Sequence, residues 1–538
     1  MTAGPETTAG RPNIVFIIAD QLRADHLGFN GNTEVRTPNL DRLTSDAAVF
    51  DRAFVANPTC MPNRASLLTG RWPSVHGTRC NGISLDPDSS TFVRSLAQSG
   101  YRTAAVGKLH HQNMGWDFEP EQAEQIRDTD PGLIDVRTAR AVGRTRETGW
   151  DQWENRERHE RGFVGMPEDY YGYQEVDLVI GHGDAPGGHW VHWARDRGVD
   201  PRVLGGPEAS AKPPTGWDQV YTTSIPVDVH PSTYVGERAA ERIKAAAASQ
   251  DPFFLFVSFP DPHHPFAPPE EYAGLYDPAV MELPNGFEQD HSDSPEHIRT
   301  MIAGRGTPNS DATMAFAVSE DQYRRAVAAQ YGLIELMDAQ VGRILAALED
   351  SGQDQDTIVV FTSDHGDMFG DHGLMLKHFV HYESVTRVPL AIRIPGTRGS
   401  AQRRSNALVS TADLAPTMLE MAGVRAFHGI QGRSLQPLLD GSTDTIREAV
   451  LIEEDQPFSI DGLPAPVRMR SVVTAEGRLT RYFGAPGIEV YDHRTDPGEL
   501  RNVAGQPQAA ELQRTLENAL LEEMARVCDL APTPTFAA

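Results

Sequence analysis

The sequence predicts an α/β protein built around parallel strands, with a smaller α+β region at its C-terminal end. Continuous apolar runs rich in β-branched residues, at residues 13–19, 253–259 and 357–362, are typical of strands buried on both faces of a parallel sheet. After about residue 440 the pattern changes to short runs at 449–453, 467–473, 480–483 and 489–491. These indicate antiparallel strands, over which a helix at about 509–527 would pack.

Composition and charge exclude some classes of partner. The chain has 538 residues, of which 39% are apolar and 23% charged, as in ordinary globular proteins. The net charge of −27 argues against nucleic acid or an anionic membrane as the main partner. An anionic substrate would therefore need local cations at its binding site.

The cysteines and the N-terminus bear on the cellular compartment. Cys60, Cys80 and Cys528 are too few for a disulfide framework, which fits a reducing compartment. Residues 1–11 lack the basic and apolar parts of a leader, and the apolar run at 14–19 is too short to span a membrane. We therefore expect a cytoplasmic protein, although a leader removed by processing would leave no trace in such a sequence.

The first predicted strand ends at a pair of polar residues, Asp20 and Gln21. In open α/β sheets, ligands bind beyond the carboxyl ends of the strands. A carboxylate and an amide at such a place are a candidate metal or polar-ligand pair. The commoner role of a single strand-end aspartate is to cap the following turn, so this pair alone does not decide between the two.

A helix that starts at residues 37–43 and a short strand at 49–55 lead to Cys60. Cys60 stands at the start of a short helix, where unpaired N–H groups and the helix dipole favour negative charge. Arg64 adds a cation four residues later. The pattern indicates an anion site that contains a reactive side chain, and a buried structural cysteine is the alternative.

The next strand, at 103–107, follows a helix at 92–100 and ends at Lys108, Leu109 and His110. In an extended segment Lys108 and His110 point the same way. From 116 to 235 the chain is rich in Gly, Pro, Trp, Asp and His, and we interpret this stretch as an insertion that borders the pocket. Its histidine-rich part, 181–192, matches no zinc spacing and is interpreted as a plain loop.

Two further strand ends carry polar clusters. A helix at 231–249 precedes the strand at 253–259, which leads to His263 and His264. After a second irregular stretch, at 272–313, a long helix at 319–348 leads to the strand at 357–362. That strand ends at Asp364 and His365, with Lys377 in the loop beyond. A strand at 388–395 and a capped helix at 411–421 complete the predicted main body.

The motif from Cys60 through Pro62 and Arg64 to Arg71 resembles the sulfatase signature. Further blocks resemble those of type I sulfatases of the alkaline-phosphatase superfamily, in the same order; they lie at 13–21, 107–110, 262–266, 363–377 and 491–500. The resemblance implies a large mixed, mainly parallel sheet between helices. It implies a catalytic domain over residues 1–440 and a C-terminal α+β subdomain over residues 441–538.

The same resemblance implies a metal site. In the family, a divalent cation is held at the positions of Asp20, Asp364 and His365, with Gln21 beside Asp20 and with the formylglycine that forms from Cys60. Many sulfatases have Asp at position 21 and Asn at 365. The variant in this chain makes the donor set less purely hard oxygen, so calcium is expected and manganese stays open.

The Gln21 and His365 variant is also similar to choline sulfatases and phosphonate monoester hydrolases. Phosphonate monoester hydrolases as a family lack the pair found here at Lys108 and His110, which favours sulfate esters. We therefore predict hydrolysis of sulfate monoesters to an alcohol or phenol and inorganic sulfate. A phosphonate monoester or phosphodiester hydrolase is the alternative, and an anion-binding protein with unmodified Cys60 is a third possibility.

The resemblance also implies roles for the remaining residues. Arg64, Lys108 and Lys377 would surround the sulfate, and the hydrated formylglycine would attack sulfur. His263 or Lys377 would protonate the leaving group, and His110 would deprotonate the covalent intermediate. His263 is preferred to His264 because of its His-x-Pro spacing.

Partners and neighbouring histidines complete the predictions. The partners would be a small sulfate ester and, during maturation, a formylglycine-generating enzyme, with neither nucleic acid nor membrane. The sequence leaves open whether the protein forms a homo-oligomer. His378 and His381 are close to Lys377 in sequence and are expected to pack rather than to touch substrate.

Overall fold

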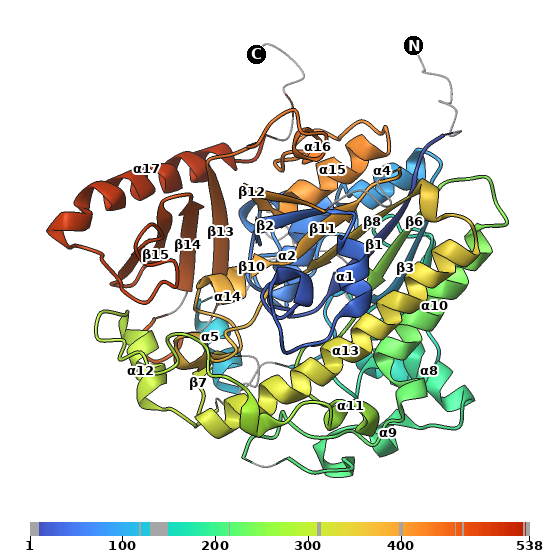
Figure 1. The fold of residues 1–538 in the computed structure, drawn as a ribbon, viewed down its shortest axis with the longest axis horizontal. Helices are drawn as coiled ribbons and strands as arrows, with labels where there is room; N and C mark the ends of the chain where they lie inside the picture. Colours follow the sequence, from blue (N-terminus) through green and yellow to red (C-terminus); the bar gives the residue numbers. More distant parts are fainter. Residues whose placement is uncertain are drawn as a thin grey trace.

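The computed structural model describes residues 10–117, 120–129, 149–214, 216–308, 314–396, 402–457, 459–464, 467–530 and 533. Parts of the predicted insertion therefore lie outside the described residues, as does the end of the irregular stretch at 272–313. Within the described chain a large sheet is covered by helices on both faces, and a second sheet lies beside it (Figure 1).

The large sheet has ten strands in the described chain, in the order β10-β2-β11-β8-β1-β6-β3-β4-β5, with β12 also paired to β2. Its strands are β1 Asn13–Ala19, β2 Ala48–Phe54, β3 Arg102–Lys108, β4 Glu175–Ile180, β5 Gly187–Gly188, β6 Phe253–Ser258, β8 Thr357–Ser363, β10 Arg387–Val388, β11 Leu390–Arg393 and β12 Arg403–Ser410. The five central strands β8, β1, β6, β3 and β4 are parallel, whereas β5, β10 and β11 pair antiparallel. The predicted mixed, mainly parallel sheet is confirmed.

Strand β1 lies at the centre of this sheet, and every residue after Asn13 is buried. Val15 and Ile17 face the hydrophobic core that α10 and α13 cover, and Phe16 faces the opposite core, against α2, α4 and α15 (Figure 1). Because successive side chains of a strand point to opposite faces, a strand covered by helices on both sides must be apolar throughout. This explains the uninterrupted apolar run that predicted the strand.

The helices on the two faces include most of those predicted. The main-body helices are α1 Pro38–Thr44, α2 Cys60–Thr69, α3 Pro73–His76, α4 Phe92–Gln98, α5 Pro120–Thr129, α7 Arg156–Arg161, α8 His189–Asp196, α9 Pro201–Leu204, α10 Pro231–Ala246, α11 Glu270–Ala273, α12 Glu296–Ala303, α13 Glu320–Asp350, α14 Glu383–Thr386, α15 Leu414–Met421 and α16 Gln436–Leu439. Ser319 begins α13 with a capping box that it shares with Gln322. None of the described helices combines the length and the hydrophobicity needed to cross a membrane.

The second sheet is antiparallel and lies after residue 441, as the change of pattern predicted. It consists of β13 Ala449–Gln456, β14 Val467–Thr474, β15 Gly477–Phe483 and β16 Ile488–Asp492. Helix α17, Ala510–Arg526, packs over it through Leu512, Leu516 and Leu520 (Figure 1). A short pair, β7 Phe316–Ala317 with β9 Leu374–Met375, lies apart from both sheets.

Two predictions need correction. The single strand expected at 388–395 is two short strands, β10 and β11, and Pro389 between them has no N–H for a sheet hydrogen bond. The stretch at 116–235 contains β4, a parallel strand of the main sheet, and helices such as α8. Strand β4 was missed because Asp177 interrupts its apolar run. This carboxylate pairs with Arg238 and Arg242 of α10, so a charge fits on that face.

Candidate active site

The parallel strands bring polar side chains to one edge of the sheet. Asp20 follows β1, Asp364 follows β8, and Lys108 is the last residue of β3. His263 follows β6, and His182 comes two residues after β4. These strands are neighbours with the same direction, so their carboxyl ends meet and the side chains converge.

Helix α2 points its N-terminus at the same place. Cys60 is its first residue, and all ten residues of the helix are buried. The Cys60 thiol lies 3.1 Å from His365 Nε2, 3.3 Å from Lys377 Nζ and 3.8 Å from Asp20 Oδ1. The predicted cysteine is therefore inside the polar cluster, where the helix N-terminus favours an anion.

Arg64, one turn further along α2, holds the cluster together. Its Nε donates to Asp364 Oδ2 at 2.7 Å, and its Nη1 donates to the Lys108 carbonyl at 2.8 Å. Its Nη2 lies 3.6 Å from Asp20 Oδ2 and has no hydrogen-bond partner among the described residues. One guanidinium thus connects the ends of three strands and still has an N–H group to offer.

Four side chains lie close enough together that they could hold a cation. Ligand atoms of Asp20, Cys60, Asp364 and His365 all lie within 4.8 Å of one another. His365 donates from Nδ1 to the Gly366 carbonyl at 2.8 Å, so its Nε2 lone pair faces the cluster. Burial and the Lys377 ammonium lower the pKa of His365 to about 4. Its imidazole is therefore neutral at pH 7, as a metal ligand must be.

The two aspartates also fit a cation. Burial and the neighbouring Asp364 raise the pKa of Asp20 to about 6, because two buried carboxylates repel one another. A divalent cation would remove this repulsion. Carboxylates with one imidazole suit calcium or manganese. Gln21 is adjacent, but its Oε1 accepts from Lys377 Nζ at 2.8 Å and its Nε2 donates to Asp367.

Lys377 and His263 form the opposite wall. Lys377 Nζ lies 3.0 Å from His263 Nε2 and 3.0 Å from His365 Nε2. His263 donates from Nδ1 to the His264 carbonyl at 2.5 Å, which leaves the Nε2 lone pair toward Lys377. Burial, His182 and Lys377 hold the pKa of His263 well below its usual range. The ring is therefore neutral at pH 7, and Nε2 can exchange a proton with the lysine.

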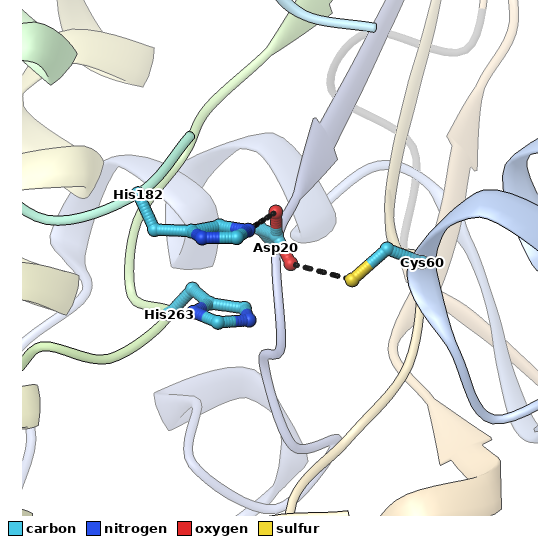
Figure 2. Close-up of side chains that lie close together, drawn as sticks. All are labelled: Asp20, Cys60, His182 and His263. Carbon is cyan, nitrogen blue, oxygen red and sulfur yellow. Dashed lines mark hydrogen bonds and ion pairs between the residues drawn. The ribbon is translucent and has the colours of Figure 1, made fainter. Parts of the chain in front are cut away.

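His182 is a site residue that the sequence interpretation missed. Its ring stacks on His263, with 3.6 Å between centroids, and its Nε2 lies 3.8 Å from Asp20 Oδ2 (Figure 2). It also contacts the ammonium of Lys108, which bridges it to Asp20. The signal was present as a strand followed by Gly181 and His182, but strand β4 itself was not recognised.

Two buried glutamates, also missed, fix the loops of the site. Glu154 accepts from the backbone N–H groups of His110, His111 and Gln112 at 2.6, 2.8 and 3.1 Å. This holds the left-handed turn at His110, whose Nδ1 has no partner among the described residues. Both glutamates act on segments distant in sequence, so no local pattern reveals them.

The second glutamate, Glu454, comes from β13 of the C-terminal sheet. It accepts from His381 Nε2 at 3.1 Å and from the backbone N–H of Phe379 at 3.2 Å, and His378 Nδ1 lies 3.4 Å away. These groups lie in the loop that carries Lys377. His381 also contacts Ser471 at 2.7 Å and is fully buried, so it packs. His378 packs too, and it also lines the cavity described next.

A cavity of about 940 Å³ leads from the cluster to the surface. Cys60, His110, His182, His263, His264, Lys377 and His378 form its inner end. Its outer part includes Trp116 and other residues of the stretch at 116–235. The cavity thus gives access to a thiol that lies beside side chains able to hold a metal ion.

Comparison with known proteins identifies the family. The sulfatase family model matches residues 12–424, which include every predicted site residue. The chain belongs to the sulfatase family. A second family model, for the C-terminal part of N-sulphoglucosamine sulphohydrolase, matches residues 370–526 of this sulfatase.

Relatives of this sulfatase span nearly its whole length. An arylsulfatase of Clostridium perfringens is 29% identical over 524 residues, which is 96% of this chain and 94% of that protein. The multifunctional alkaline phosphatase superfamily protein PehA of Trinickia caryophylli is 29% identical over 528 residues, covering 94% of this chain and 93% of that one. The phosphonate monoester hydrolase of Agrobacterium radiobacter has a similar structure, with a TM-score of 0.75, 26% identity and 98% of each chain covered. This sulfatase is a sulfuric ester hydrolase.

Proposed function

We propose that this sulfatase cleaves sulfate monoesters to an alcohol or phenol and inorganic sulfate, with a formylglycine made from Cys60 as the nucleophile. The observation that supports this most directly is the position of Cys60. Its side chain lies at a helix N-terminus, within 3.8 Å of Asp20, His365 and Lys377. A thiol could attack sulfur but could not break the resulting covalent intermediate, whereas a hydrated aldehyde offers one hydroxyl to attack sulfur and a second whose deprotonation expels the sulfate and restores the aldehyde.

Asp20, Asp364 and His365 are the residues that would hold the divalent cation, with Gln21 alongside. A bound cation would withdraw charge from the sulfate oxygens and favour ionisation of the attacking hydroxyl. Calcium is the proposed ion, with manganese as the alternative because His365 supplies nitrogen. Arg64 would keep both carboxylates oriented through its contacts with Asp364 and Asp20.

Arg64, Lys108 and Lys377 would place three positive charges around the sulfate, which would offset its repulsion of an anionic nucleophile. We assign protonation of the leaving oxygen to His263 together with Lys377, because Nε2 and Nζ lie 3.0 Å apart and both face the cavity. His264 instead directs Nδ1 toward Gln21, 3.1 Å away.

His110 is the proposed base for release of sulfate. Burial, Lys108 and Arg64 hold its pKa well below the usual range, so the ring is neutral and can accept a proton. It lines the cavity beside Cys60, and Glu154 fixes its backbone. Proton transfer to His110 from the remaining hydroxyl would let the intermediate collapse to the aldehyde and expel sulfate.

The test combines two measurements on one preparation made together with a formylglycine-generating enzyme. Mass spectrometry of the peptide containing residue 60 should show the aldehyde, and the same protein should release sulfate from 4-nitrophenyl sulfate. The modified fraction and the specific activity should rise together across preparations. Full activity from protein that carries only the thiol would refute the proposal.

A phosphonate monoester or phosphodiester hydrolase is the second candidate. The similarity to the hydrolase of Agrobacterium radiobacter and the Gln21 and His365 variant favour it. The pair of Lys108 and His110 inside the cluster argues for the sulfate ester. Parallel assays of 4-nitrophenyl sulfate and a 4-nitrophenyl phosphonate monoester separate the two, and a higher kcat/KM on the phosphonate would reverse our assignment.

A further inference from the structure

We propose that the chain with its thiol intact at residue 60 binds a zinc ion through one sulfur, two imidazole nitrogens and one carboxylate oxygen. These four ligands, the zinc group, belong to Cys60, His182, His263 and Asp20 (Figure 2). The proposal concerns the cysteine that the sequence encodes, so it does not depend on the proposed conversion to formylglycine.

The ligand atoms have nearly the spacing of a tetrahedral zinc site. One ligand atom from each residue of the zinc group lies within 4.8 Å of all the others. Cys60 Sγ lies 3.8 Å from Asp20 Oδ1, and His182 Nε2 lies 3.8 Å from Asp20 Oδ2. Zinc bonds of about 2.0–2.3 Å at tetrahedral angles place neighbouring ligand atoms about 3.3–3.7 Å apart. Small side-chain rotations would therefore bring the ligands to bonding distance.

The two imidazoles have the orientation that zinc requires. The Lys108 ammonium contacts His182 Nε2, and the Lys377 ammonium lies 3.0 Å from His263 Nε2. An ammonium can only donate a hydrogen bond, so each of these Nε2 atoms presents a lone pair. In His263 the other nitrogen, Nδ1, donates to the His264 carbonyl and fixes the ring. Neutral imidazoles held in this way are the usual histidine ligands of zinc.

The donor set favours zinc over a harder cation. Zinc prefers sulfur and nitrogen, whereas calcium binds oxygen. The neighbouring group of possible ligands, the aspartate group, shares Asp20 and Cys60 but adds Asp364 and His365. It therefore has two carboxylates and one imidazole, and Arg64 already binds one of the carboxylates, that of Asp364, at 2.7 Å. We assign zinc to the zinc group and calcium or manganese to the aspartate group.

Zinc bound here would be closed off from solvent. Asp20, Cys60 and His263 are at most 1% exposed, and the side chain of His182 is 16% exposed. Four protein ligands would leave no position for water, which is the arrangement of structural zinc sites. Binding would release the thiol proton to solvent and hold the sulfur in a metal bond. The zinc-loaded chain should therefore lack hydrolase activity.

Lys108 is the group that zinc must displace. Its ammonium contacts both Asp20 and His182 and supplies positive charge between them. A lysine ammonium stands on a flexible four-carbon stem, so it can turn away when a divalent ion takes that place. Lysine and zinc should therefore compete for the same two ligand residues.

The first test measures zinc binding to metal-free protein made without a formylglycine-generating enzyme, with the thiol at residue 60 verified by mass spectrometry. Competition with a chromophoric chelator should show one tight zinc per chain, and Cys60→Ser should weaken its binding roughly 100-fold. Cys80→Ser is the matched control, because Cys80 is also a buried thiol but burial raises its pKa to about 12. It should leave the affinity unchanged, as should Cys528→Ser. Equal affinity in the parent and in Cys60→Ser would overturn the proposal.

The second test separates the two groups of ligands. His182→Ala removes a ligand of the zinc group only and should weaken zinc binding roughly 100-fold, whereas His365→Ala, which changes only the aspartate group, should have a much smaller effect. The reverse order would place zinc in the aspartate group and overturn the assignment. Cobalt(II) provides a readout in the unaltered chain: the absorption of tetrahedral cobalt and a thiolate charge-transfer band should appear, and an octahedral spectrum would contradict the site.

Two further variants of the experiment test the competition and the role of sulfur. Lys108→Met should strengthen zinc binding about tenfold, because the competing ammonium is gone, and an unchanged affinity would contradict a site that Lys108 occupies. The second arm rests on the proposed function: formylglycine has no sulfur, so converted protein should bind zinc as weakly as Cys60→Ser. Equally tight zinc in both forms would overturn the zinc site, whereas converted protein without sulfatase activity would count against the proposed function alone.

Discussion

Replacing Glu454 with glutamine should impair catalysis from a position outside the catalytic residues. Glu454 lies in β13, and its carboxylate accepts from the loop that carries Lys377. Leu376, His378 and Phe379 in this loop have positive φ angles of 70°, 76° and 62°, a conformation that side-chain-bearing residues rarely adopt without external support. The carboxylate provides part of that support, so the substitution should release Lys377 from its place beside Cys60.

The size of the effect follows from the contacts. Oε1 of Glu454 accepts from the Phe379 N–H at 3.2 Å and from Gln456 at 3.0 Å, with His378 at 3.4 Å, and Oε2 accepts from His381 at 3.1 Å. Hydrogen bonds to a charged group contribute about 1.5–3 kcal/mol and neutral ones about 0.5–1.5 kcal/mol. In Glu454→Gln one carboxylate oxygen remains an acceptor, and the other is replaced by an NH₂ group that faces a hydrogen-bond donor of the loop. The loss should be about 3 kcal/mol, which corresponds to a shift of roughly 100-fold toward the released loop.

The assay is steady-state hydrolysis of 4-nitrophenyl sulfate with thermal unfolding measured in parallel. Glu454→Gln should lower kcat by one to two orders of magnitude. The control is Glu453→Gln on the opposite face of β13. Glu453 is also buried and binds the Ser74 N–H at 2.8 Å and Arg470 at 3.4 Å, with no contact to the Lys377 loop. It should lower the unfolding temperature and leave kcat within threefold. An unchanged kcat in Glu454→Gln, or an equal fall in both variants, would refute the reasoning.

Three further outcomes are expected. Arg64→Lys should reduce kcat/KM about 100-fold and weaken metal binding, because a single ammonium cannot replace the contacts that orient Asp364 and bind the Lys108 carbonyl. Kinetics and elemental analysis check this, and full activity would contradict it. Removal of metal by a chelator should abolish sulfate release and lower the unfolding temperature, and added calcium or manganese should restore both. Activity that is unaffected by chelation would argue against the metal site. Burial lowers the pKa of His111 and of His230 to about 3, whereas their pKa in the unfolded chain is near 6.5. As the pH falls below 6.5 the unfolded chain takes up protons before the folded chain does, so the free energy of unfolding decreases. Each of these two histidines should lower the free energy of unfolding by about 2 kcal/mol between pH 7 and pH 5. His230→Asn keeps an acceptor at the start of α10 and should flatten the pH dependence of the denaturation midpoint.

The inner end of the candidate site was predictable because its residues follow strong local signals. Asp20, Lys108 and Asp364 each come at or just after the end of a buried strand, and Cys60 and Arg64 stand in the first turns of a helix. Parallel strands that end at one edge bring such residues together whatever the sequence distance between them. The mixed sheet and the C-terminal antiparallel sheet followed from the contrast between the continuous apolar runs of the main body and the short runs after about residue 440.

The supporting residues were not predictable in this way. Strand β4 carries Asp177, whose charge is neutralised by Arg238 and Arg242 of α10, 61 and 65 residues away. The strand was therefore not recognised from its local pattern, and His182 was missed with it. Glu154 and Glu454 act through backbone N–H groups of distant loops, and a buried glutamate leaves no periodic signal. Residues that act through electrostatic contacts with distant segments cannot be identified from the local sequence pattern.

The complete burial of α2 would limit when the proposed modification of Cys60 could take place. The thiol is 1% exposed and is enclosed by residues up to Lys377, which leave the ribosome more than 300 positions later. The proposed maturation enzyme would therefore reach the extended segment around residue 60 only while the later strands are still missing from the sheet. Protein that folds with the thiol intact would stay inactive afterwards, so recombinant yield of working enzyme should depend on how fast modification proceeds relative to translation and folding.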